Sequence, residues 1–106
     1  MSRIYISGPI TKDPDFFPKF REKQKMLEES GYQTCNPAYL AFSMPKALHS
    51  EYMHVCYAML DNCDAIYMMD GWNESDGARQ ERERASKRGM PIVYEKTPSN
   101  ESDYCY

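Results

Sequence analysis

The sequence of 106 residues lacks the cysteine spacing of a metal or dithiol site. Its four cysteines are Cys35, Cys56, Cys63 and Cys105, and no two of them form a C-x-x-C pair. No apolar run approaches the length of a membrane span, and no secretory signal pattern is found. We therefore expect reduced thiols in a cytoplasmic protein that does not bind a membrane.

Histidine and glycine are also scarce, which excludes several functions that depend on a known histidine or glycine motif. The two histidines, His49 and His54, are five positions apart, a poor spacing for shared metal ligands. With only five glycines, the chain has no P-loop and no G-x-G-x-x-G, and H-E-x-x-H and G-x-S-x-G are absent as well. We predict no metal site and no bound cofactor.

Positive charge is not in excess, because the formal net charge is −3. A broad basic surface for polymeric nucleic acid is therefore not expected, although small anionic ligands remain possible. The charged run at residues 79–88 predicts an exposed helix face with Arg79–Glu83 and Glu83–Lys87 pairs.

What the chain does contain is an alternation of apolar runs and helical patterns, typical of one α/β domain with a parallel sheet. Ligands of such sheets bind beyond the carboxyl ends of the strands. We expect the domain to span residues 1–94 and a polar tail to span 95–106, with a non-periodic loop at 38–44. The predicted strands are 3–7, 32–35, 65–69 and 91–94, and the predicted helices run from about 15 to 31, 45 to 62 and 75 to 89.

The first two helices each carry an apolar stripe that predicts the face packed on the sheet. In the first helix the stripe is Phe17, Phe20, Gln24 and Leu27. In the second helix the stripe is Leu48, Tyr52, Val55 and Met59.

The third helix carries the most informative residue of the chain. Ser75 is a good N-cap, and Ala78, Glu81 and Ala85 share one face of the helix that follows. This face directs Glu81 inward among alanines. A carboxylate in that position is either a side chain that pairs with a neighbouring arginine or a functional group.

Carboxylates and a phenol gather at the predicted carboxyl edge of the sheet. They are Tyr5, Asp64, Asp70, Asp76 and Glu81. A carboxylate beside a sugar can attack the anomeric carbon, and a second acid can assist the leaving group. The N-terminus of the last helix, with the Ser75 hydroxyl, provides donors for an anion such as a phosphate.

Three stretches together resemble the nucleoside 2-deoxyribosyltransferase-like superfamily, in its short phage- and prophage-associated, DUF4406-like branch. They are IYISGPI at 4–10, GYQTCNPA at 31–38 and CDAIYMMDGWNESDGARQERERA at 63–85. The resemblance implies a small flavodoxin-like three-layer fold with a four-stranded parallel sheet. It also implies a homo-oligomer, a dimer or larger, in a bacterial or phage-infected host cell. It also implies that Glu81 is the nucleophile that forms a (deoxy)ribosyl intermediate, while Tyr5 orients it and Asp64 contacts the nucleoside.

The same resemblance bears on the substrate. Six residues before the nucleophile, enzymes of this superfamily that act on free nucleosides carry an aspartate, and the nucleoside 5′-monophosphate N-glycosidases carry a serine. Ser75 occupies that position here. Lys12 is the one candidate phosphate ligand in the first loop, and Arg79 replaces a small or apolar residue. The expected substrate-binding residues are Ser7, Gly8, Pro9, Asn36, Asp70, Trp72, Ser75, Asp76 and Gly77.

Three functional hypotheses follow. The first is an enzyme that hydrolyses or transfers the base of nucleoside 5′-monophosphates or (deoxy)nucleosides. The second is a module of the same fold that binds or sequesters a nucleotide without turnover. The third is an adaptor whose surface binds another protein.

Overall fold

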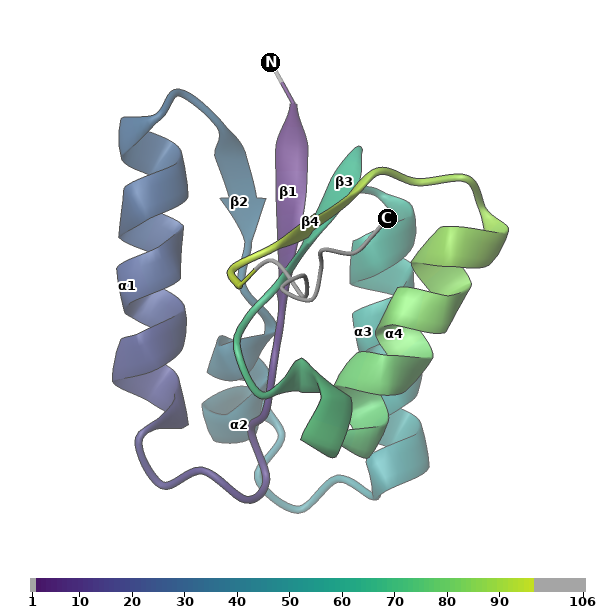
Figure 1. Cartoon of the computed structure of the whole chain (residues 1–106). Helices are drawn as coiled ribbons and strands as arrows, with labels where there is room; N and C mark the ends of the chain where they lie inside the picture. Colours follow the sequence, from purple (N-terminus) through teal and green to yellow (C-terminus); the bar gives the residue numbers. More distant parts are fainter. Residues whose placement is uncertain (1, 97–106) are drawn as a thin grey trace.

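Four parallel strands form one sheet between two layers of helices (Figure 1) in the computed structural model, which describes residues 2–96. The strand order is β2-β1-β3-β4, which confirms the predicted α/β fold. The strands are β1 (Arg3–Ser7), β2 (Gln33–Cys35), β3 (Ala65–Met68) and β4 (Ile92–Tyr94). The helices are α1 (Phe16–Glu29), α2 (Leu40–Ser43), α3 (His49–Asp61) and α4 (Asp76–Lys87), with 3-10 turns η1 (Pro37–Tyr39) and η2 (Trp72–Glu74).

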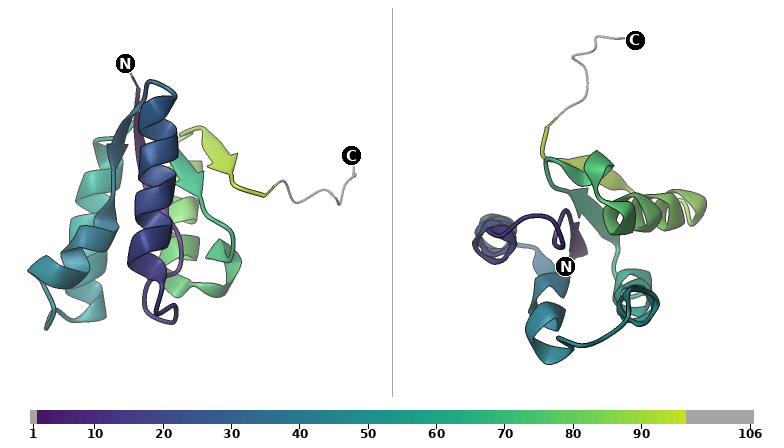
Figure 2. Two further views of the ribbon diagram at one scale, coloured as in Figure 1. Left: turned by 90° about the vertical axis from the view of Figure 1, so that its left-hand side faces the viewer. Right: turned by 90° about the horizontal axis from the view of Figure 1, so that it is seen from below.

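The two faces of the sheet bury separate hydrophobic clusters, because successive side chains of a strand point to opposite faces. One face packs against α3 and α4 through Tyr5, Ile66 and Met68. The other face packs against α1 through residues such as Ile6 and Tyr67. Figure 2 shows α1 on one side of the sheet and the α3–α4 pair on the other. Among residues 2–96, no helix is both long and apolar enough to cross a membrane.

The segment after β2 differs from the sequence prediction of a loop at 38–44. It forms η1 and the short helix α2 instead. The Asn36 side chain accepts a hydrogen bond from the Ala38 N–H at 2.9 Å, and Pro37 occupies the first helical position. This cap, with a proline preset for helical φ, folds a stretch that is too short to show a period.

The predicted stripe of the second helix was displaced by one residue. Helix α3 begins at His49, and Leu48, which precedes it, is 67% exposed. The buried residues are Met53, Cys56 and Leu60. They repeat at intervals of three and four, as the predicted stripe does, so periodicity alone does not distinguish the two faces.

Helix α4 matches its predicted limits, with Gly89 in a left-handed conformation (φ +70°) just after it. Its exposed face forms the expected Glu83–Lys87 pair at 3.3 Å. Arg79 pairs with Asp76 and donates to the Asn73 carbonyl, so the predicted Arg79–Glu83 pair is wrong.

The predicted tail begins at a residue that is part of the fold. The Glu95 N–H donates to the Met68 carbonyl, and the Glu95 carboxylate pairs with Lys23 of α1 at 2.8 Å. Residues 97–106, including Cys105, lie outside the described part of the chain.

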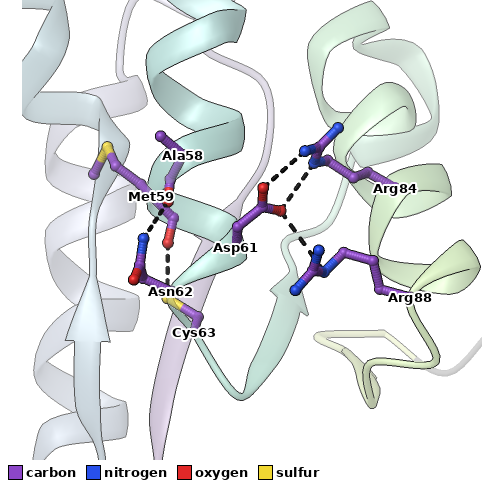
Figure 3. A network of polar contacts seen from close by, with 7 residues as sticks. All are labelled: Ala58, Met59, Asp61, Asn62, Cys63, Arg84 and Arg88. Atoms are coloured by element: carbon purple, nitrogen blue, oxygen red, sulfur yellow. Dashed lines mark hydrogen bonds and ion pairs between the residues drawn. The ribbon is translucent and has the colours of Figure 1, made fainter.

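An ion-pair network joins the C-terminal ends of α3 and α4 (Figure 3). Asp61 accepts two hydrogen bonds from Arg84, at 2.9 and 2.7 Å, and lies 3.7 Å from Arg88 Nε. The Arg84 guanidinium also stacks over the Tyr57 ring, 4.6 Å from its centroid. Bidentate pairing makes this contact stronger than an ordinary surface ion pair.

We expect the Arg84→Gln variant to have a lower free energy of unfolding than wild type, because it loses the Asp61 pair and the stacking on Tyr57. Urea denaturation measures this loss. Lys87→Gln is the matched control, since Lys87 lies in the same last turn but pairs with exposed Glu83 instead of Asp61. Equal losses in the two variants would mean that the network contributes nothing beyond the helix dipole.

Candidate active site

Glu81 points into the protein, as the sequence predicted. Ala78, Glu81 and Ala85 are only 1%, 5% and 0% exposed, and they form the face of α4 that meets the sheet. Because the alanine side chains are short, the helix backbone lies close to the sheet. The Glu81 carboxyl group therefore reaches the central strand β1.

Two hydroxyl groups of β1 hold the Glu81 carboxyl group. Tyr5 Oη donates to Glu81 Oε2 and Ser7 Oγ donates to Glu81 Oε1, each at 2.6 Å. Tyr5 and Ser7 lie two positions apart on one strand, so both side chains point to the same face. Both are completely buried. This arrangement fixes the position and the orientation of the carboxyl group.

Burial controls the protonation of this group. It raises the pKa of Glu81 from 4.5 to about 7, although the hydrogen bonds from Ser7 and Tyr5 oppose the shift. Burial, and then the charge of Glu81, raises the pKa of Tyr5 well above 10 and that of the Cys56 thiol to about 12. Near neutral pH, Tyr5 and Cys56 thus stay protonated while Glu81 exchanges its proton.

A hollow leads from the surface to Glu81. Its outer part has a volume of about 210 Å³ and its deep part about 70 Å³. The two parts share five lining residues and are therefore continuous: Ile10, Thr11, His49, Ser75 and Gly77. Pro9, Lys12, Glu74 and Asp76 line only the outer part, and Tyr52, Met53, Cys56 and Glu81 line only the deep part.

The N-terminus of α4 forms one side of the mouth. Ser75 Oγ accepts a hydrogen bond from the Ala78 N–H at 3.2 Å, as expected of an N-cap. The first intrahelical bond runs from the Arg79 N–H to the Ser75 carbonyl. The N–H groups of Asp76 and Gly77 precede this bond, and the Ser75 O–H proton is not used by the cap, so all three can donate to an anion.

A comparison with known protein families finds a match that covers nearly the whole described part of the chain. The sequence profile of a family described as a domain of unknown function, DUF4406, matches residues 2–94. The chain belongs to the DUF4406 family. No curated protein matches it.

In this DUF4406 protein, the predicted site residues fall into two groups. Tyr5 and Ser7 contact Glu81, and Pro9, Ser75, Asp76 and Gly77 line the hollow. Gly8 is buried beside Ser7, where a Cβ atom would lie 2.9 Å from Met69 Cβ. Gly8 therefore brings the ends of β1 and β3 close together.

The other four predicted residues lie elsewhere in the described part of the chain. Asp64 precedes β3 at the amino edge of the sheet, opposite to Glu81, and accepts a hydrogen bond from the Arg3 N–H at 2.8 Å. Asn36 caps η1. Asp70 faces away from the hollow and pairs with Lys96 at 3.1 Å. Trp72 packs beside Tyr94 and under the Arg82 guanidinium.

Several residues of the hollow were not singled out from the sequence. Ile10, Thr11, His49, Met53 and Cys56 line it, and Tyr52 was assigned to the core stripe. A helix start at His49 would have placed His49, Met53 and Cys56 on one face at intervals of four and three.

Among residues 2–96, no cluster of three His, Cys, Asp or Glu side chains could hold a metal ion. The absence of a cofactor stays a prediction.

The raised pKa of Glu81 makes stability depend on pH. The folded protein binds this proton more tightly than the unfolded chain, so the stabilisation is complete below pH 4.5 and is lost as pH rises through about 7. At about 1.4 kcal/mol per pKa unit, the loss reaches about 3 kcal/mol. Glutamine has no such proton, so the Glu81→Gln variant should not lose stability in this pH range. Urea denaturation at pH 5 and pH 8 should show that the free energy of unfolding of the variant rises relative to that of wild type. A difference between the two that does not change with pH would contradict the assignment.

Proposed function

We propose that this protein cleaves the N-glycosidic bond of nucleoside 5′-monophosphates or related (deoxy)nucleosides, with Glu81 as the nucleophile. One observation carries the proposal: a buried carboxyl group, fixed by Tyr5 and Ser7, lies at the deep end of a hollow with a helix N-terminus at its mouth. The resemblance of residues 3–94 to the nucleoside 2-deoxyribosyltransferase-like superfamily supports the same reaction.

The reaction takes two steps. In the first, a Glu81 carboxylate oxygen bonds to C1′ of the sugar, and the electron pair of the C1′–N bond leaves with the base, which takes up a proton. In the second, a water oxygen bonds to C1′ and the water loses a proton to solvent. The bond between C1′ and the Glu81 oxygen breaks, and its electron pair returns to the Glu81 carboxylate. A second base in place of water gives transfer instead of hydrolysis. Tyr5 and Ser7 hold the carboxylate in line with C1′ during both steps.

The mouth favours a 5′-phosphate over a 5′-hydroxyl group. Ser75 O–H and the N–H groups of Asp76 and Gly77 are donors on one side of the mouth, and Lys12 adds a cation on the other. Asp76 is also negative, but its charge is partly offset by its pair with Arg79.

A nucleotide-binding module without turnover is the second candidate. The observation that favours it is that both oxygens of Glu81 already accept short hydrogen bonds, which lowers the nucleophilicity of a carboxylate. In that case Glu81 would accept a hydrogen bond from a bound nucleotide.

Release of free base distinguishes the two. Wild-type protein incubated with nucleoside monophosphates and free nucleosides is expected to release base, and kcat/KM should rise with pH up to about 7 as Glu81 loses its proton. Glu81→Gln should lower the rate by about a thousandfold or more. Glu83→Gln, an exposed change on the same helix, is the control. No base release, together with a nucleotide-induced rise in melting temperature in both wild type and Glu81→Gln, would favour the binding module.

Ser75 gives a separate test of the 5′-phosphate. Ser75→Asp keeps an N-cap but places a negative charge beside the phosphate, so we expect kcat/KM for monophosphates to fall about tenfold or more relative to nucleosides. Ser75→Asn keeps the cap without the charge and should change this ratio far less. Equal effects of Asp and Asn on both substrates would show that Ser75 acts only as a cap.

A further inference from the structure

The α3 wall of the hollow contains a buried hydroxyl group that the proposed reaction leaves unused. Tyr52 Oη is inaccessible to solvent and has no hydrogen-bond partner among the residues that the structure describes. A buried polar group without a partner destabilises a protein, and native proteins rarely keep one without a role. The hydroxyl group therefore calls for a partner outside residues 2–96.

The surroundings of Tyr52 indicate where that partner lies. The Tyr52 ring packs against the core cluster that contains Tyr5 and Cys56, and the residue lines the deep part of the hollow together with Glu81. That part, about 70 Å³, is several times the roughly 15 Å³ that one water needs. Burial raises the pKa of Tyr52 to about 12, so the hydroxyl keeps its proton and can donate it.

The other two ends of a nucleotide are already assigned. Glu81 contacts C1′ of the sugar, and the N-terminus of α4 at Ser75 receives the 5′ end. Both groups belong to the α4 side of the hollow. The base then lies against the walls that remain, which are α3 and the loop after β1. These walls offer apolar surface from Ile10 and Met53, which suits the faces of a planar ring. They also include Tyr52, whose buried hydroxyl group reaches the edge of the ring when its side chain turns toward the hollow.

We propose that Tyr52 Oη donates a hydrogen bond to an acceptor atom of the nucleobase and thereby helps to select the substrate and to stabilise the departing base. This assignment rests on the proposed N-glycosidic function. The acceptor is a ring nitrogen or a carbonyl oxygen, on which negative charge grows as the C1′–N bond breaks. The hydrogen bond strengthens in the transition state, so its loss should lower kcat more than it raises KM.

The test compares two leaving groups in the full-length protein. Tyr52→Phe should lower kcat/KM for a nucleoside monophosphate about tenfold. With 4-nitrophenyl ribofuranoside 5-phosphate, which has no base, the same variant should stay within about twofold of wild type. The matched control is Tyr57→Phe, because Tyr57 lies on the same helix and its hydroxyl donates to Gln80 at 3.1 Å outside the hollow. An equal loss with both leaving groups, or no loss with either, would overturn the role of Tyr52.

Stability without ligand provides a second readout. Tyr52→Phe removes an unpartnered hydroxyl, so its melting temperature should equal or exceed that of wild type, whereas Tyr57→Phe loses a hydrogen bond. A lower melting temperature for Tyr52→Phe than for Tyr57→Phe would mean that Tyr52 has a structural partner, and would overturn the proposal.

Failure of the proposed function can be told apart from failure of this inference. If wild type releases no base from any substrate, the N-glycosidic function fails, and Tyr52 is then judged by binding alone. A nucleoside monophosphate should raise the melting temperature of wild type more than that of Tyr52→Phe, while ribose 5-phosphate raises both equally. Equal shifts with the nucleotide, or no shift at all, would overturn the base contact.

Discussion

The pair of hydrogen bonds between β1 and the Glu81 carboxyl group is the contact on which the rest of the site depends. A carboxyl group that is 5% exposed is unfavourable in its charged form unless donors surround it. Tyr5 and Ser7 supply two donors from β1, one of the two central strands of the sheet. The same burial that makes the charge unfavourable raises the pKa of Glu81 to about 7. The carboxyl group can therefore both lose and regain its proton near neutral pH.

The parallel sheet explains why a binding hollow is found beside this contact. All four strands end at the same edge, so the loop after β1 and the N-terminus of α4 meet there. Helix α3, which crosses from β2 to β3, completes the third wall. The result is a hollow whose sides differ: backbone donors on α4, Ile10 and Lys12 on the β1 loop, Tyr52 and Met53 on α3, and the Glu81 carboxyl group at the deep end.

Much of this could be predicted from the sequence, for physical reasons that differ between residues. The inward position of Glu81 followed from the i, i+3, i+7 spacing with two alanines, which only one helix face satisfies. The strand limits followed from β-branched and aromatic runs next to Gly and Pro. The side of α3 that faces the sheet did not follow, because two adjacent stripes have the same period and only tertiary packing selects between them.

Which polar residues reach the hollow was the hardest point to predict, because its lining comes from different elements. Asp64 and Asp70 flank the same strand, but the strand's direction puts Asp64 at the edge away from Glu81. Tyr52 is an aromatic residue in a periodic stripe, and its sequence context is that of an ordinary core residue. Only the three-dimensional position of its hydroxyl group distinguishes it.

The placement of Tyr5 and Ser7 on β1 also has a consequence for motion. A strand hydrogen-bonded on both sides, as β1 is to β2 and β3, belongs to the part of a protein whose amides exchange last with solvent. The two donors that hold the Glu81 carboxyl group therefore belong to the part of the fold that opens last, and the carboxyl group stays fixed as long as the sheet is intact.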